Sequence, residues 1–272
     1  MTESRYIRQE TLPQVGREGQ ALLAEARIAV VGLGALGSAS SEVLARSGIG
    51  YLRLIDRDCV EFSNLQRCSL YTEEDALTSR PKTKAAAEHL RAINSTIEYE
   101  AHVCNVDSSN VVELLSGVDL VVDGADNFEL RVLINEAANK LGIPWIYTGV
   151  LGTIGMLMPV LPEGPCFACL SPTPPAPGTY LTTTEAGILA STTRVAATLQ
   201  AAMAMRLLLE GEKAKGAPPL SESGDALAST ATLHQFDAWT TEFEEIVLEK
   251  NLDCPVCSHH RYDHLDARST IQ

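Results

Sequence analysis

The sequence lacks any run of about 18 apolar residues, the stretch by which a membrane-spanning helix is recognised. Its first residues, MTESRYIRQETLPQ, carry several charges and have no apolar core of the kind that a secretory signal peptide requires. No internal repeat is visible in the sequence. We therefore predict a cytoplasmic protein that neither spans a membrane nor is secreted.

Positive charge is also scarce, because 21 lysines and arginines stand against 35 acidic residues and give a formal net charge of −14. A surface of that sign repels both nucleic acid and anionic membranes, which argues against general affinity for either. A local basic pocket remains compatible with this balance. A pocket of that kind in an acidic protein usually serves one specific ligand.

Hydrophobic residues, by contrast, are present at an ordinary globular level of 45%, and 272 residues suffice for a sizeable core. In the first 150 residues, short apolar runs alternate with segments of helical spacing. These runs are continuously apolar, which is typical of strands covered by helices on both sheet faces. The pattern predicts a Rossmann-like, doubly wound α/β fold with a largely parallel sheet. Strands are expected at 28–31, 51–55, 97–106, 118–123 and 145–149, and helices from about 35 to 47 and at 82–93 and 130–141.

After residue 150 the regular alternation of strands and helices ends. Strands at 156–161, 231–239 and 243–248 are expected to extend the sheet in antiparallel fashion. A helix is predicted at 189–210. The Pro- and Thr-rich residues 171–187 predict a long irregular loop, and the Gly-, Pro- and Ser-rich residues 211–229 predict a mobile one.

A glycine motif follows the first predicted strand directly and precedes a predicted helix. Gly32, Gly34 and Gly37 fit G-x-G-x-x-G, which lets the backbone approach a phosphate and presents helix N–H groups to it. Asp56 ends the next predicted strand, where a carboxylate usually binds ribose hydroxyls. These four residues predict a nucleotide site, but the motif alone does not distinguish NAD, FAD and ATP.

Basic and amide side chains after Asp56 favour a triphosphate. Arg67 and Lys82 are cations that could stabilise charge on the phosphates during nucleotidyl transfer, and Asn64 could donate a hydrogen bond. Taken alone, each cation is more often a solvated surface residue. Their place downstream of a nucleotide loop is what favours the functional interpretation.

Five segments together resemble the ThiF/MoeB/HesA family, the bacterial relatives of ubiquitin-activating enzymes. They are GLGALG, LIDRDCVEFSNLQR, RPKTKA, DGADNFELR and LHQFDAWTTEFEEI, and two C-x-x-C pairs accompany them over nearly the whole chain. The resemblance implies ATP- and Mg²⁺-dependent adenylation of the carboxyl-terminal glycine of a small ubiquitin-like protein, usually a sulfur carrier ending in Gly-Gly, by a homodimer. It also implies one adenylation domain over 1–272, with a nucleotide-binding half at 1–150, a substrate-handling and zinc half at 151–257 and a flexible tail at 258–272.

The resemblance also assigns roles by position. Asp56 would hold the ribose, whereas Asn64, Arg67 and Lys82 would contact the phosphates. Asp126 would position Mg²⁺ at the α-phosphate, and Arg8 would reach the phosphates of the neighbouring subunit. Three alternatives stay open: Asp58 competes for the ribose, Asp123 and Asn127 are possible supporting groups, and Asp126 could instead cap the helix at 128–141.

The seven cysteines form an odd set, which argues against a disulfide framework. Four of them stand in two C-x-x-C pairs, and two such pairs complete the tetrahedral sulfur coordination that selects zinc. We therefore predict a structural Zn²⁺ that ties the end of the chain to its middle. The predicted ligands are Cys166, Cys169, Cys254 and Cys257, whereas Cys59, Cys68 and Cys104 receive no role.

The sequence departs from the family in the loop near residue 183. Many relatives keep a cysteine two residues before E-A-G, and the matching residue here is Thr183. A hydroxyl is a far weaker nucleophile than a thiolate at neutral pH. The expectation is therefore a reaction that stops at the acyl-adenylate, with sulfur delivered by a separate donor protein.

Three rival hypotheses remain at this point. The same chemistry could adenylate a ribosomal peptide, a modified tRNA base or a tRNA-linked carboxylate, although the acidic charge disfavours tRNA. An NAD-dependent oxidoreductase lacks a recognisable hydride-transfer constellation in this sequence. A non-catalytic scaffold would have no use for Arg67, Lys82 and Asp126.

Overall fold

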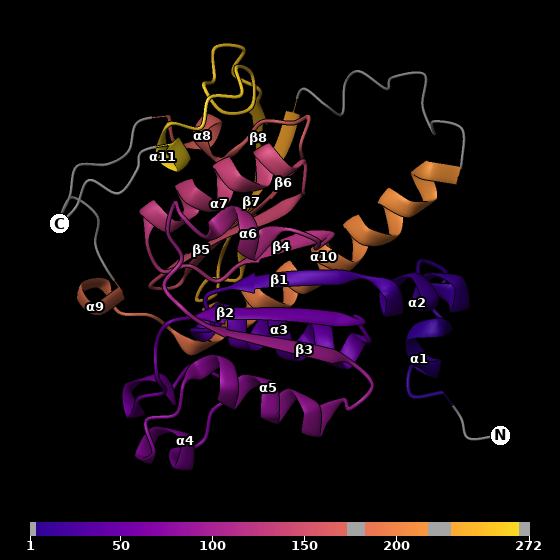
Figure 1. The fold of residues 1–272 in the computed structure, drawn as a ribbon, viewed down its shortest axis with the longest axis vertical. Coiled ribbons are helices and arrows are strands. Elements are labelled where there is room, and N and C mark those ends of the chain that lie inside the picture. The colour runs from indigo at the N-terminus through magenta and orange to yellow at the C-terminus, as the bar shows by residue number, and fades with distance from the viewer. Residues whose placement is uncertain (1–3, 173–182, 217–229, 267–272) are drawn as a thin grey trace.

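The computed structural model describes residues 4–172, 183–216 and 230–266. Its centre is one eight-stranded sheet in the order β3-β2-β1-β4-β5-β6-β7-β8 (Figure 1). Strands β1 to β5 are parallel, and β6, β7 and β8 join them in antiparallel pairing. The predicted largely parallel α/β fold with an antiparallel extension is therefore confirmed. The strands are β1 (Arg27–Val31), β2 (Tyr51–Asp56), β3 (Glu98–Val103), β4 (Leu120–Asp123), β5 (Trp145–Leu151), β6 (Ile154–Val160), β7 (Thr230–Asp237) and β8 (Glu242–Glu249).

Helices cover both faces of this sheet. Helices α3, α5 and α10 pack on one face, and α6 and α7 pack on the other. The helical elements are α1 (Ile7–Glu10), α2 (Gly16–Glu25), α3 (Ala35–Ser47), the 3₁₀ turn η1 (Phe62–Asn64), α4 (Glu73–Leu77), α5 (Lys82–Ile93), α6 (Val111–Leu115), α7 (Phe128–Leu141), α8 (Phe167–Leu170), α9 (Thr183–Ala186), α10 (Ala190–Gly216) and α11 (Asp263–Asp266). No helix among these described residues is long and apolar enough to cross a membrane.

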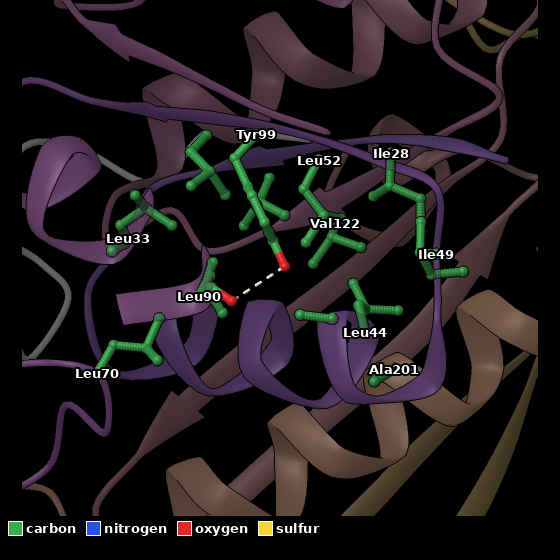
Figure 2. Packing of buried hydrophobic residues seen from close by; sticks show 14 of the residues in the cluster. Ile28, Leu33, Leu44, Ile49, Leu52, Leu70, Leu90, Tyr99, Val122 and Ala201 are labelled. Atoms are coloured by element: carbon green, nitrogen blue, oxygen red, sulfur yellow. Dashed lines mark hydrogen bonds between the residues drawn. The ribbon is translucent and has the colours of Figure 1, made fainter. Parts of the chain in front are cut away.

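The larger core lies between the sheet and α3, α5 and α10. Ile28, Leu52 and Val122 project from three neighbouring strands toward Leu44 of α3 and Leu90 of α5 (Figure 2). Each fully buried side chain of this size contributes about 1.5–3 kcal/mol relative to exposure. This packing holds the carboxyl ends of β1, β2 and β4 in a fixed arrangement.

Continuous burial, which the apolar runs predict, is found in the central strands and is absent from the edge strands. All residues of β4 are buried, whereas Tyr99 is the one buried residue of β3, which lies at the edge of the sheet. The strand predicted at 97–106 ends at Val103, and residues 104–106 instead turn toward the cavity described below.

Two predictions after residue 170 also change. The helix predicted at 189–210 continues to Gly216, so residues 211–216 of the predicted mobile segment are helical, and 217–229 lie outside the described residues. The loop predicted at 171–187 contains the single-turn helix α9, and its residues 173–182 also lie outside the described residues.

Part of the tail predicted to be flexible at 258–272 is packed against the rest of the chain. The buried carboxylate of Glu136 on α7 accepts hydrogen bonds from the backbone N–H groups of His264 (3.0 Å) and Leu265 (3.0 Å). The His264 ring contacts the same carboxylate at 2.6 Å. Helix α11 is therefore held against α7, a long-range contact with no local sequence signal.

Candidate nucleotide site and metal centre

A cavity of about 270 Å³ opens at the carboxyl ends of β1, β2, β3 and β4. Ligands of doubly wound folds bind at this edge, where the direction of the crossover connections changes. Most of its lining comes from loops that follow strands, together with the start of α7. The lining residues are Val31, Gly32, Gly34, Ile55, Asp56, Arg57, Asp58, Lys82, Cys104, Asn105, Val106, Gly124, Ala125, Asp126, Asn127, Glu129, Leu130 and Leu133.

Two of the three motif glycines are required by the backbone itself. Gly32 has φ +88°, and a Cβ there would lie 2.4 Å from the carbonyl oxygen of Gly124. A Cβ on Gly37 would lie 1.8 Å from the carbonyl oxygen of Gly32. Gly34 differs, because a Cβ there meets nothing within 4 Å and the residue lines the cavity. Backbone packing therefore does not require a glycine at residue 34, and the absent Cβ leaves space in the cavity.

This contrast gives a matched pair of substitutions. Gly34→Ala should change the free energy of unfolding by less than about 1 kcal/mol, yet weaken ATP binding because the methyl group enters the cavity. Gly37→Ala should instead destabilise the protein by about 2 kcal/mol or more, because two backbone segments must separate. Chemical denaturation and nucleotide titration of both variants measure the two effects. Equal destabilisation by the two substitutions would contradict this assignment.

Asp56 is oriented by the backbone around it. One carboxylate oxygen accepts from the N–H of Leu33 at 2.6 Å, and the other accepts from the N–H of Asp58 at 2.7 Å. Burial raises the pKa of the Asp56 carboxyl, although Lys82 and the two backbone donors oppose that rise. The carboxylate therefore lies on the cavity wall in one fixed orientation, with lone pairs left over for hydroxyl donors.

Lys82 supplies the buried positive charge of the cavity. Its Nζ lies 3.0 Å from Oδ2 of Asp58, and the side chain is only 10% exposed. Burial lowers the pKa of Lys82, but the carboxylates of Asp56 and Asp58 outweigh that effect and raise it overall. Lys82 consequently stays charged at neutral pH and can exchange Asp58 for a phosphate.

Asp126 lines the cavity with an exposed carboxylate, whose Oδ1 accepts from Nδ2 of Asn127 at 2.9 Å. The cap of α7 is Asn127, not Asp126, since Oδ1 of Asn127 accepts from the N–H of Leu130 at 2.8 Å. Asp126 therefore does not cap α7, which was the alternative to its predicted role in metal binding.

Asp123 is fully buried beneath the site and does not line the cavity. Its Oδ2 pairs with Nε of Arg131 at 2.9 Å and accepts from the N–H of Thr148 at 3.1 Å. Burial raises the pKa of the Asp123 carboxyl against the effect of Arg131. This ion pair joins α7 to β4 and β5, which fixes the segment that carries Asp126.

Three predicted phosphate contacts do not line the cavity. Asn64 is buried and its Oδ1 accepts from the N–H of Glu61, while Arg67 donates to the carbonyl oxygen of Ser63 at 2.7 Å. Both lie on the turn around η1. Arg8 is exposed on α1, whose neighbours Tyr6 and Gln9 contact the carboxyl ends of α5 and α3, away from the cavity.

Sequence reasoning missed several lining residues. Arg57 follows Asp56 directly, Asn105 follows the end of β3, and Glu129 lies in the first turn of α7. Their positions in the sequence could have indicated them, because residues that directly follow parallel strands lie together at one edge of the sheet. Gln200 of α10 was also missed; its amide reaches the carbonyl oxygen of Asp123 (2.8 Å) and accepts from Ser40 of α3 (2.6 Å).

The four predicted zinc ligands come together although they lie far apart in the sequence. Their sulfur atoms all lie within 4.8 Å of one another, with Cys166 and Cys254 3.7 Å apart and Cys169 and Cys257 3.4 Å apart. Hydrogen bonding from the Cys166 thiol lowers the pKa of Cys169 to about 6. Four sulfurs at such spacing fit a tetrahedral zinc site with no ligand position left for a substrate.

Buried groups support this cluster from α7. Nδ2 of Asn135 lies 3.6 Å from Sγ of Cys166, and its Oδ1 accepts from the N–H of Phe167 at 3.0 Å. Phe167 in turn packs on the buried Trp145. Metal binding would thereby join the segment after β8 to α8 and to the hydrophobic core between the sheet and helices α6 and α7.

The family model of the ThiF family matches residues 6–256 of this chain. The chain belongs to the ThiF family. A ThiF-family relative from Bacillus subtilis, the sulfur carrier protein ThiS adenylyltransferase, is 39% identical over 93% of this chain and 71% of its own. The sulfur carrier protein adenylyltransferase of Thermus thermophilus is 38% identical over 93% of this chain and 90% of its own. The SAMP-activating enzyme E1 of Haloferax volcanii is 36% identical over 96% of this chain and 91% of its own.

Solved structures share the fold of this chain. Escherichia coli MccB with ATP superposes with a TM-score of 0.74 at 23% identity, covering 94% of this chain and 74% of that one. At this identity the likeness concerns the fold alone. The family match together with the two adenylyltransferase relatives identifies the chain as an adenylyltransferase.

Proposed function

We propose that this protein uses ATP to adenylate the carboxyl-terminal glycine of a small ubiquitin-like sulfur carrier that ends in Gly-Gly. The observation that carries the proposal is the cavity at the sheet edge, which brings Asp56, Lys82 and Asp126 together beside the glycine loop. Names of relatives support the substrate class, since two of them act on sulfur carrier proteins.

Within this proposal each cavity residue has a distinct task. Asp56, fixed by two backbone donors, accepts from the ribose hydroxyls. Lys82 exchanges Asp58 for phosphate oxygens, and the amino end of α3 adds backbone N–H groups. Asp126 offers an exposed carboxylate on the cavity lining, and Mg²⁺ is usually bound through one or two carboxylates together with phosphate oxygens.

Asn64, Arg67 and Arg8 complete the proposed phosphate contacts from outside the cavity lining. Arg67 would leave the carbonyl oxygen of Ser63 when a triphosphate offers it a bidentate partner, while Asn64 lies on the same turn. Helix α1, which carries Arg8, packs away from the cavity of its own chain, so a phosphate contact by Arg8 requires the cavity of a partner subunit. The proposal therefore includes a homodimer.

The chemistry is one substitution at phosphorus. A carboxylate oxygen of the terminal glycine attacks the α-phosphorus, the bond from the α-phosphorus to the bridging oxygen breaks, and pyrophosphate leaves with the electron pair of that bond. Lys82 and Arg67 stabilise the charge that develops on the phosphates. Because Thr183 stands where many relatives have cysteine, we place the end of this enzyme's reaction at the acyl-adenylate.

The proposal extends to partners and architecture. A separate donor protein would convert the acyl-adenylate to a thiocarboxylate, and the four cysteines would hold Zn²⁺ as a structural ion. Residues 1–272 would form one adenylation domain, since one sheet runs through both of its halves. We also place the protein in the cytoplasm, where ATP is available.

An ATP–pyrophosphate exchange assay tests the function. Exchange should require Mg²⁺ and a carrier with a free Gly-Gly carboxyl terminus, and should disappear when that carboxylate is amidated. The same assay with short peptides in place of the carrier tests the peptide rival, and NADH fluorescence on titration with the protein tests the oxidoreductase rival. Exchange supported equally by an amidated carrier would contradict the proposal.

A further inference from the structure

Arg57 connects the ends of two strands across the mouth of the cavity. Its Nη1 donates to Oδ1 of Asn105 at 2.9 Å, and its Nε lies 3.6 Å from Oδ1 of Asp58. Both Arg57 and Asn105 line the cavity, and the Arg57 side chain is 66% exposed. The guanidinium therefore spans from the end of β2 to the residues after β3.

The lining of the cavity combines two kinds of chemistry. The glycine loop, Lys82 and Asp126 supply backbone, cationic and acidic groups that suit phosphates and a metal ion. Val106 after β3 and Leu130 and Leu133 of α7 supply apolar side chains that pack against one buried hydrophobic cluster. A wall that combines apolar side chains with a few polar groups suits a flat heteroaromatic ring. In a nucleotide whose ribose binds Asp56, the base would lie against this wall.

We propose that Arg57 covers the base in this cavity, with its guanidinium plane against the purine of ATP and Asn105 holding it in that position. The inference rests on the proposed function, because it requires ATP to be the ligand. Arginine is suited to the task since its planar, weakly hydrated cation stacks on aromatic faces.

The contact with Asn105 explains why an exposed arginine would contribute affinity. A free arginine side chain loses rotamer entropy on ordering, and a hydrogen bond made before ligand arrives removes part of that cost. Asp58 contributes in the same way and also contacts Lys82, so one carboxylate links Arg57 to Lys82. Arg57 is thus a base-contacting residue, and Asn105 a positioning residue.

Titrations of the full-length protein with ATP and with inorganic tripolyphosphate test the inference. Arg57→Ala should weaken ATP binding by about 3–30-fold, the range of a desolvated cation–aromatic contact, and leave tripolyphosphate binding within about 2-fold. Arg57→Lys keeps the charge and should recover less than half of that loss on a logarithmic scale. Asn105→Ala should weaken ATP binding by less than Arg57→Ala and add nothing when combined with it.

Arg17→Ala removes a well-exposed arginine from α2 and serves as the matched control, with unchanged binding expected. Unchanged ATP binding by Arg57→Ala would overturn the inference and leave the proposed function standing. Equal weakening of ATP and tripolyphosphate would overturn it too, because Arg57 would then bind phosphate. A wild-type protein that binds no ATP would overturn the proposed function itself.

Discussion

Asp126→Ala is expected to lower the rate of ATP–pyrophosphate exchange by about 10²–10³-fold, the usual effect of removing one group that stabilises transition-state charge. The reason is that Asp126 is exposed in the cavity and does not cap α7, a role taken by Asn127. Its removal should therefore spare the fold. Initial exchange rates over a range of Mg²⁺ concentrations measure the effect.

Asp126→Asn refines this test, because the amide keeps the shape and loses the charge. Its exchange rate should recover in part at high Mg²⁺, whereas the melting temperature should match that of the parent protein. Glu25→Ala, which removes an exposed carboxylate at the end of α2, is the control and should exchange normally. An Asp126→Ala enzyme with more than a third of the parent rate would refute the role of this residue.

Cys254→Ser is expected to cost the protein its zinc and at least about 3 kcal/mol of stability, since metal binding to a four-thiolate site is coupled to folding. Cys254 is buried and its sulfur lies among the other three within 4.8 Å. For a chain of this size, that loss should lower the melting temperature by roughly 6–12 °C. Elemental analysis and thermal denaturation provide the two measurements.

Cys59→Ser is the matched control for the zinc site, because Cys59 is an exposed cysteine outside the cluster. It should keep one zinc ion per chain and change the stability by no more than about 0.5 kcal/mol. Chelation of the parent protein should reproduce the melting temperature of Cys254→Ser. A Cys254→Ser protein that retains stoichiometric zinc and full stability would show that the four sulfurs do not form a metal site.

Short motifs made the central part of the fold and site predictable. The glycine positions and Asp56 follow from a strand, a tight turn and a helix that adjoin in sequence, and the structure shows the steric reason at Gly32 and Gly37. The cysteine cluster was equally accessible, because the ligand number and spacing restrict the chemistry even when the pairs are far apart.

Contacts between distant elements were not predictable in the same way. The cover formed by Arg57 depends on where β3 ends relative to β2, and the support of Asp123 depends on Arg131 eight residues later on another element. The packing of α11 on Glu136 joins residues that lie 128 and 129 positions apart. Such pairings depend on tertiary geometry, which a single sequence does not encode locally.

The most direct test of the whole account is the structure of the protein with ATP, Mg²⁺ and a non-reactive carrier tail. We expect the ribose hydroxyls on Asp56, the phosphates against Lys82 and the glycine loop, and Mg²⁺ between Asp126 and the α-phosphate. A nucleotide bound elsewhere, or a cavity in which Lys82 and Asp126 make no contact with phosphate or metal, would contradict the account.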